Sequence, residues 1–245
     1  MIKNFCVIVN TNSSYSDLWE MFFKSLETFF PDQKVYVFSD IFTNIDNKYI
    51  HVKYDPNDDF RTQFFKSMQS VKEEFCLTLN EDYILYDYVD LQKIDYCLDF
   101  LNKIKNCSFV RLTKNFLHPH IQVKENIFYL NNKEKYFFSQ TATIWRKDIL
   151  KKVYENSPNS GISRKGEELQ LEELANETCK KMNLSGAYYY NNEEKRGMFH
   201  YDSSIFPYIA SALVGGKWNL KEYEKELLPI LKDYNINYNA RGIYK

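Results

Sequence analysis

Residues 75–79 constrain the fold of this chain more than any other stretch, because they form a continuous apolar run of strand-forming side chains. A short apolar run that ends abruptly in polar residues is typical of a buried strand. The polar residues that follow are Asn80, Glu81 and Asp82. Ligands of open α/β sheets gather at the carboxyl ends of the strands. Carboxylates there suit a divalent cation, which in turn suits a diphosphate, so this stretch indicates a nucleotide-sugar site.

The first third of the chain predicts the opening of a doubly wound sheet. Residues 5–9 and 35–38 are short apolar runs and predict two buried strands. Between them, apolar side chains recur at helical spacing from Ser16, the expected N-cap, to Pro31, which ends the helix. A β-loop-α-β unit of this kind is characteristic of parallel α/β sheets.

The rest of the chain continues the alternation of strands and helices. A third strand is predicted over 49–54, and later strands over 108–112, 126–130, 137–144 and 187–190, with a hairpin across 131–134. Helices are predicted over 60–73, from 146 onward, over 167–182 and over 219–234, the last kinked by Pro229. Residues 156–166 are the most loop-like segment, and a loop of this length often acts as a lid.

The balance of charge and the scattered cysteines exclude several classes of protein. The 245 residues include 32 Lys and Arg and 33 Asp and Glu, a formal net charge of -1. That balance gives no general attraction to nucleic acid or to an anionic membrane. Five Cys without a CxxC pair favour a reducing cytoplasm over a disulfide framework or a zinc cluster. We expect neither a signal peptide nor a segment that spans a bilayer.

Several polar residues stand where a strand meets a loop or a helix begins. Asp40 follows the second predicted strand, where an acid often contacts a nucleoside; the alternative is an Asp that caps a turn. Arg61 begins a helix and is expected to meet a phosphate or the acids after residue 79, or else to be an ordinary surface Arg. Lys217 follows Gly215-Gly216, which we expect to act as a flexible hinge, and is expected to bind a phosphate.

The three polar residues after residue 79 divide into two roles. Asn80 and Asp82 are two apart, so in an extended chain they point the same way and can share one cation. Glu81 would then face a ribose, an Arg or the acceptor. The alternative is that these acids only cap the next helix. His200 follows the last predicted core strand and would complete a metal site or touch a diphosphate, whereas a lone His is more often structural. His118 and His120 lack a third ligand nearby, which favours a simple loop pair.

Four segments together resemble bacterial glycosyltransferases of the GT-A fold, which transfer sugars from nucleoside diphosphates during surface polysaccharide synthesis. The segments are Asn10-Thr11-Asn12 through Trp19, Asp59-Phe60-Arg61 through Glu81-Asp82-Tyr83-Ile84-Leu85, Ser139-Gln140-Thr141 through Trp145-Arg146, and Gly215-Gly216-Lys217-Trp218 with Arg241-Gly242. The resemblance implies a GT-A (Rossmann-like) mixed sheet flanked by helices in one domain. Residues 1–107 would bind the nucleotide sugar, 108–216 the acceptor, and 217–245 would form a C-terminal helix and tail.

The resemblance also assigns roles to individual residues. It places Asn10, Thr11 and Asn12 at the donor, and Gln140 and Trp145 at the acceptor. It implies a catalytic base at Glu172, with Glu173 and Glu168 as alternatives; such a base accepts the proton of the attacking hydroxyl, and burial raises its pKa. Asp82 and His200 would hold Mg²⁺ or Mn²⁺, although Asn80 replaces the first acid of the usual Asp-x-Asp motif.

The expected partners are a nucleoside diphosphate sugar and a glycan or lipid-linked acceptor of capsule or lipopolysaccharide synthesis. The expected location is the cytoplasm, with peripheral contact at the inner face of the membrane as an open alternative. One rival function is a non-catalytic nucleotide-sugar or glycan-binding module. A second is a nucleotidyltransferase acting on sugar phosphates, although residues 10–14 lack the usual glycines. No P-loop, GxGxxG, GxSxG or HExxH motif is present.

Overall fold

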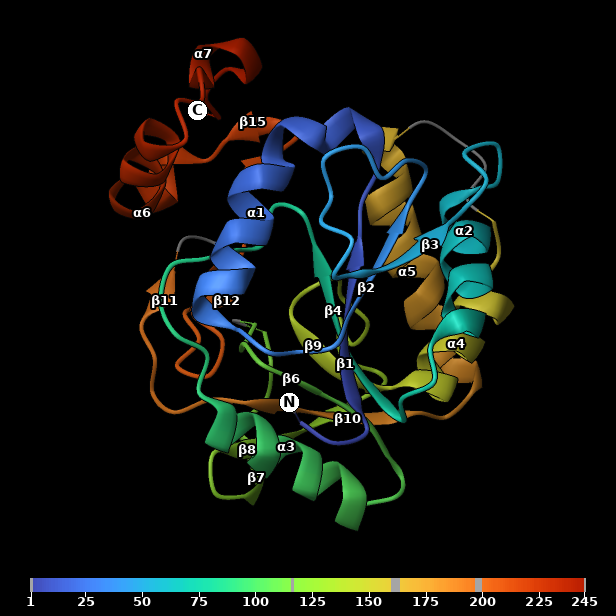
Figure 1. Ribbon diagram of the computed structural model, residues 1–245. Coiled ribbons are helices and arrows are strands. Elements are labelled where there is room, and N and C mark those ends of the chain that lie inside the picture. Colours follow the sequence, from blue (N-terminus) through green and yellow to red (C-terminus); the bar gives the residue numbers. More distant parts are fainter. Residues whose placement is uncertain (1, 116, 160–163, 197–199, 245) are drawn as a thin grey trace.

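A nine-stranded mixed sheet runs through the centre of the computed structural model (Figure 1), which describes residues 2–115, 117–159, 164–196 and 200–244, with the side chains of 164–170 left out. The strand order is β3-β2-β1-β4-β9-β6-β10-β8-β7. The predicted α/β class with a mixed sheet is therefore confirmed. In chain order the strands are β1 (Phe5–Asn10), β2 (Val35–Ser39), β3 (Ile50–Lys53), β4 (Phe75–Asn80), β6 (Cys107–Arg111), β7 (Ile121–Lys124), β8 (Ile127–Asn131), β9 (Thr143–Arg146) and β10 (Ser185–Tyr189).

The first four strands of this sheet are parallel, as the sequence predicts. β1 lies between β2 and β4, and each of these three strands is almost wholly buried. Continuous burial explains why these strands are unbroken apolar runs rather than alternating patterns. The register pairs Asn10 with Asn80, so the ends of β1 and β4 lie side by side.

The middle of the sheet contains the antiparallel pairings that make the sheet mixed. β9 is antiparallel to both β4 and β6 and separates them, whereas β6 and β10 are parallel. The predicted hairpin across 131–134 is wrong: the hairpin is formed by β7 and β8, and Asn126 adopts a left-handed φ of 57° in its turn. Asn tolerates that conformation better than most residues. The turn therefore lies at Asn126, five residues before the predicted one.

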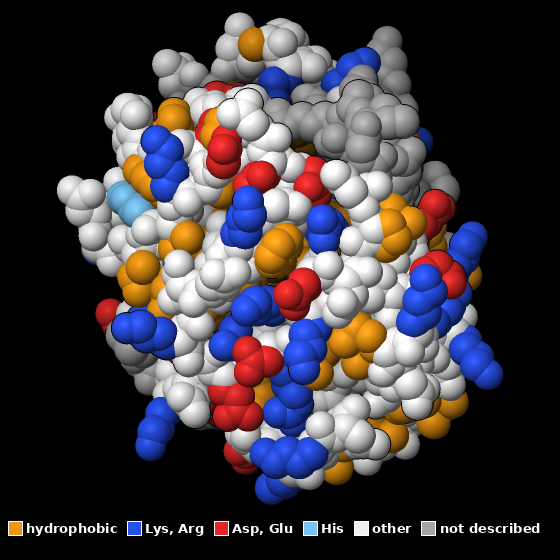
Figure 2. Space-filling model, turned by 90° about the vertical axis from the view of Figure 1, so that its right-hand side faces the viewer, with side chains coloured by type: hydrophobic (Ala, Val, Ile, Leu, Met, Phe, Trp, Pro, Cys, Tyr) orange, Lys and Arg blue, Asp and Glu red, His pale blue; other side chains and the backbone are white. Residues whose placement is uncertain are grey.

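Helices cover both faces of the sheet. One core cluster joins α1 (Ser16–Phe29) and α3 (Leu91–Lys103) to one face. A second joins α2 (Phe60–Ser67), α4 (Lys147–Asn156) and α5 (Arg164–Lys181) to the other. Figure 2 looks onto the side of α2 and α4, where basic and acidic side chains are interspersed. No helix within the described ranges is long and apolar enough to cross a membrane.

A third, smaller core lies on the outer side of α1. It is formed by Leu18 and Met21 of α1 together with side chains of α6 (Leu220–Asp233) and of short strands. The short strands are β5 (Ile84–Leu85) with β13 (Tyr208–Ile209), and β14 (Leu213–Val214) with β15 (Lys217–Trp218). The remaining elements are β11 (Lys195–Arg196) with β12 (His200–Tyr201), α7 (Tyr238–Arg241) and 3₁₀ turns at Ser13–Tyr15 and Met68–Ser70.

Three local predictions are corrected by this structure. Ser16 is not an N-cap: Asn12 caps the 3₁₀ turn that leads into α1, and its Oδ1 accepts a hydrogen bond from the Ser14 amide. The backbone of α6 departs from helical angles at Tyr223 (φ -125°, ψ 29°) rather than at Pro229. Gly215-Gly216 is the two-residue turn of the β14–β15 hairpin rather than a hinge, with φ of 58° and 78°.

Candidate active site at the carboxyl edge of the sheet

The predicted polar break after β4 is a tight turn at the carboxyl edge of the sheet. The Tyr83 amide donates a hydrogen bond to the Asn80 carbonyl at 3.1 Å, so the chain reverses at Glu81 and Asp82. We expected Asn80 and Asp82 to point the same way because two residues do so in an extended chain. The chain turns here instead, so that expectation does not apply. The reading that these acids cap the next helix is also wrong, because Asp90 caps α3 by accepting from the Lys93 amide.

Glu81 and Asp82 face different neighbours. Glu81 is buried, and its charge helps to raise the pKa of Arg241, which is raised mainly by the hydrogen bond to Asp17. Asp82 is half-buried, and its charge acts on the Tyr208 hydroxyl, whose pKa is raised chiefly by burial. The charge of Asp82 therefore acts on the second half of the chain, and that of Glu81 acts on its C-terminal segment.

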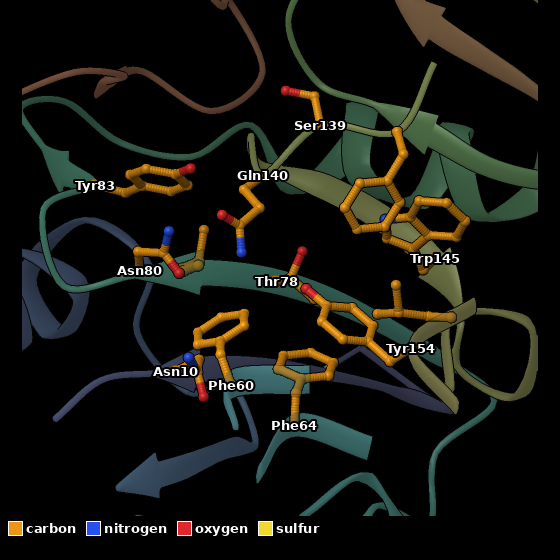
Figure 3. A pocket seen from close by; sticks show the side chains of 13 residues that line it. Asn10, Phe60, Phe64, Thr78, Asn80, Tyr83, Ser139, Gln140, Trp145 and Tyr154 are labelled. Carbon is orange, nitrogen blue, oxygen red and sulfur yellow. The ribbon is translucent and has the colours of Figure 1, made fainter. Parts of the chain in front are cut away.

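A small pocket opens beside these strand ends (Figure 3). Thr78, Leu79 and Asn80 of β4 form one side with Asn10 of β1. The other sides come from α2, α4, β9, Tyr83 and the segment 138–140. The lining side chains outside β1 and β4 are Phe60, Phe64, Tyr83, Phe138, Ser139, Gln140, Trp145, Leu150 and Tyr154. Phe64 stacks on Tyr154 at a centroid distance of 4.0 Å, which gives the pocket a rigid aromatic wall.

The pocket is uncharged and polar at its centre. In Figure 3 the side chains of Thr78, Asn80, Gln140 and Tyr154 point toward one another. Gln140 hydrogen-bonds Tyr154, and burial raises the pKa of that hydroxyl, which keeps it neutral. The cavity volume is about 20 Å³, room for one water molecule. A cavity of that size is too small to enclose a nucleoside.

Glu172 holds the roof of this pocket. One carboxylate oxygen accepts a hydrogen bond from the Gln140 amide at 2.7 Å, and Ser139 donates a second. One turn later, Asn176 accepts from the Phe138 amide at 2.8 Å and donates to the Phe138 carbonyl. The predicted base thus positions the segment 138–140 in this structure. Glu173 is exposed, and the side chain of Glu168 lies outside the described residues, as do residues 160–163 of the predicted lid.

The position of Glu172 gives a testable dependence on pH. Burial raises its pKa above the ordinary 4.5, against the lowering effect of the Gln140 amide, Ser139 and Arg111. The folded state therefore keeps this proton to higher pH than the unfolded chain, and the free energy of unfolding falls as pH rises from 4.5 through the raised pKa. Urea unfolding should show that the stability of the wild type falls relative to that of Glu172→Gln as pH rises over that window.

The control for this experiment is Glu173→Gln, which removes an exposed carboxylate from the next position of the same helix. Its profile should follow that of the wild type. If Glu172→Gln and Glu173→Gln had the same pH profile, the Glu172 carboxylate would not be the group that titrates.

The predicted donor residues of the first loop hold the loop together. Trp19 Nε1 donates to Thr11 Oγ1 at 2.7 Å, and the Tyr54 hydroxyl donates to the Thr11 carbonyl at 2.7 Å. Asp40 accepts from both the amide and the hydroxyl of Ser13, at 2.8 and 2.6 Å, which lowers its pKa against the effect of burial. With Asn12 capping the 3₁₀ turn, these contacts fix the loop beside Asn10. They favour the turn-capping reading of Asp40 over direct contact with a nucleoside.

Three further predicted residues lie in settings of different kinds. Arg61 donates to the carbonyls of Tyr154 and Glu155 at the end of α4, so its guanidinium joins two helices. Trp145 is 2% exposed and packs on Phe109 at 4.3 Å. Lys217 is exposed on β15. Of these, Trp145 alone reaches the pocket, and as part of its wall.

His200 lies in a different cluster from the pocket. It is buried, and its Nε2 is in short hydrogen-bond contact with the Tyr223 hydroxyl. Burial lowers its pKa, and the charges acting on it are those of Glu222, Asp202 and Arg196. Within the ranges that the structure describes, no group of three or more His, Cys, Asp or Glu side chains is arranged to hold a metal ion.

Arg111 is a residue of this edge that the sequence analysis missed. It ends β6, is 1% exposed, and its Nη2 donates to the carbonyls of Tyr136 and Phe137. Burial lowers its pKa to about 10, against the opposing charges of Glu172, Tyr208 and Tyr83. Burial raises the pKa of the Tyr208 hydroxyl most, and the charges of Arg111 and Asp82 act on it in opposite directions: Arg111 lowers that pKa and Asp82 raises it. The sequence feature that could have identified Arg111 is the presence of an Arg at the end of a predicted buried strand.

Comparisons with known proteins support the fold class. No protein-family model matches the chain, and no curated protein matches it. The structure of S. aureus TarS superposes with a TM-score of 0.50 and 16% identity, over 81% of this chain and 36% of TarS. The bifunctional IspDF of Campylobacter jejuni gives 0.45 and 17%, over 82% and 52%. A cytidylyltransferase of Leptospira borgpetersenii gives 0.46 and 14%, over 99% of both chains.

The chain is thus similar to TarS in fold while spanning only about a third of its length. Together, the mixed sheet, its flanking helices and the polar carboxyl edge define a single α/β domain with a Rossmann-like, GT-A-like architecture.

Proposed function

We propose that this protein is a glycosyltransferase that moves a sugar from a nucleoside diphosphate to a glycan or lipid-linked acceptor in bacterial surface polysaccharide synthesis. The observation that supports this most is the turn of Glu81 and Asp82, which directly follows the central strand at the carboxyl edge of the sheet. Ligands of such sheets bind at that edge. TarS, which shares the fold, has been crystallised in complex with UDP-GlcNAc and with UDP.

In this proposal the two halves of the edge have separate tasks. Asn10, Asn80 and the loop fixed by Asp40 would bind the nucleoside, and Asp82 would face the diphosphate. Gln140 would orient the acceptor from the roof that Glu172 holds in place. Glu172 could act in one of two ways. It could accept the proton of the attacking hydroxyl directly, which its raised pKa favours, or it could only hold Gln140 in position.

The side chains at the turn fit a hard divalent cation only in part. Carboxylate and amide oxygens are the ligands that Mg²⁺ and Mn²⁺ prefer, and Asp82, with Asn80 beside it, offers them. His200 would have to exchange its Tyr223 contact to contribute. When bound, the ion would neutralise charge on the leaving diphosphate. We propose Asp82 as its protein ligand, with diphosphate oxygens and water completing the shell.

The first experiment is a thermal-shift panel of nucleoside diphosphates and their sugars, with and without Mn²⁺. A ligand present at one hundred times its Kd should add about 2.7 kcal/mol to the free energy of unfolding. We expect one nucleotide family to raise Tm, and Mn²⁺ to enlarge the rise. A shift that ignores Mn²⁺ would remove the cation from the proposal, and the absence of any nucleotide-dependent shift would contradict a nucleotide-sugar transferase.

A further inference from the structure

Two basic side chains are buried beside the candidate site without a carboxylate in ion-pair contact among the described residues. Arg111 and Lys114 are 1% and 5% exposed, and they are the only buried Lys or Arg among the residues whose side chains the structure describes. Neither takes part in an ion pair within the same set of residues. Burying a charge is unfavourable unless it is paired. The carboxylate whose charge acts on Arg111 is that of Glu172, so two buried cations stand against one carboxylate.

The two cations belong to one cluster with two histidines. Arg111 Nη1 lies 2.9 Å from His118 Nε2, and Lys114 Nζ is in short contact with His120 Nε2. Burial lowers the pKa of both histidines, and the charge of Lys114 lowers it further. The pKa of His118 is lowered to about 2. We call Arg111, Lys114, His118 and His120 the basic cluster. Its mutual repulsion makes it unsuited to a metal cation.

The cluster has an open side and an atom without a partner. Lys114 Nζ lies 4.5 Å from the ring centroids of both Tyr190 and Tyr201, which are half-buried, and His120 is exposed at the rim. Deeper in, the buried Nε of Arg111 has no hydrogen-bond partner among the described residues. The hydrogen-bond donors of the cluster thus extend from His120 at the surface to the buried Arg111. The charge of Arg111, with that of Asp82, acts on the Tyr208 hydroxyl.

We propose that the basic cluster binds a phosphoryl group, with Lys114 and His120 as its direct contacts and Arg111 and His118 behind them. Two buried cations exceed what one carboxylate neutralises, whereas a phosphate ester carries a charge near -1.5 to -2 and several acceptor oxygens. Lysine binds such groups as a compact point charge. The phosphoryl group would belong either to the donor diphosphate or to a phosphate on the acceptor. Only this assignment of its source rests on the proposed function.

The test is a titration with inorganic phosphate at constant ionic strength, with chloride as the balancing ion and Tm as the signal. Wild type should show a saturable, phosphate-specific rise in Tm. Lys114→Met should weaken the apparent phosphate affinity about tenfold or more, the range expected for a lost hydrogen bond to a charged group. Lys124→Met is the matched control: Lys124 Nζ lies 3.6 Å over the Tyr96 ring, also a cation–π contact but outside the cluster.

Two outcomes would overturn the proposal: no phosphate-specific shift in the wild type, or equal affinities in Lys114→Met and Lys124→Met. His120→Gln decides the question if Lys114→Met fails to fold, because His120 is exposed and its loss should still weaken phosphate binding. Repeating the titration with saturating UDP separates the two sources. Competition between UDP and phosphate identifies the donor diphosphate, and an additive shift identifies a separate phosphate. No glycosyl transfer is measured, so failure of the proposed function leaves this test intact.

Discussion

Replacing Asp82 with Asn is expected to lower kcat about 10³-fold while leaving the fold intact. The carboxylate is half-buried in a turn at the carboxyl edge, where the leaving diphosphate would develop its charge. Asp82 would act there through the divalent cation that it holds, and removing one preorganised contribution to the stabilisation of such charge typically lowers kcat by about 10²–10³. An amide keeps the shape of the side chain but is neutral, so it would hold the proposed divalent cation, which neutralises the diphosphate, much more weakly. The measurement is nucleoside diphosphate release by the purified variant with the donor identified in the thermal-shift panel.

Asp95→Asn serves as the control for this variant, because Asp95 is an exposed acid on α3 away from the carboxyl edge. It should retain wild-type turnover. Near-wild-type kcat in Asp82→Asn would contradict the role of Asp82, whereas equal losses in both variants would point to a general effect of net charge.

Gly186→Ala is expected to destabilise the protein by about 3 kcal/mol or more, at the upper end of the usual range for overpacking a core. A Cβ at this position would lie 2.3 Å from Phe109 Cζ and within 2.7 Å of two further atoms of the same ring. Phe109 is fully buried between Phe137 and Trp145. Gly186 lies where the register of β10 against β6 shifts, so the ring occupies the place of the missing side chain. Urea unfolding measures the loss.

Two further variants separate a steric clash from backbone strain. Gly216→Ala adds a Cβ where nothing lies within 4 Å, but at a φ of +78°, so only strain should appear, at about 1 kcal/mol. Phe109→Leu in the Gly186→Ala background should recover part of the lost stability by making room. Strictly additive losses in that double variant would argue against the clash.

The local parts of this fold could be predicted from the sequence. β1, β2 and β4 are recognisable because burial on both faces makes them short apolar runs, and α1 because its apolar face repeats at helical spacing. β9 and the β7–β8 hairpin were misplaced. The side chains of 137–144 are as apolar as those of a strand, but only the contacts of β9 with β4 and β6 decide which of them pair. No local pattern carries that information.

The candidate site divides in the same way. The polar edge after β4 was predicted, because the end of a buried strand is visible in the sequence. The conformation of Asn80–Asp82 was not predicted, because the hydrogen bond from the Tyr83 amide that marks the turn leaves no signal in the sequence. The roof was also invisible, because Glu172 and Asn176 meet residues 138–140 only when α5 packs on the sheet. The assigned roles of Asp82, His200 and the first loop remain predictions.

The antiparallel position of β9 has a consequence for how the chain reaches its final form during synthesis. β4 completes its pairing with β1 early, yet its other neighbour is β9, which emerges from the ribosome only after α3, β6, β7 and β8. Until then one edge of the central strand is bare, and bare apolar edges invite pairing with other chains. The strands of residues 1–107 are thus completed by a strand from residues 108–216, and neither segment is a complete folding unit without the other.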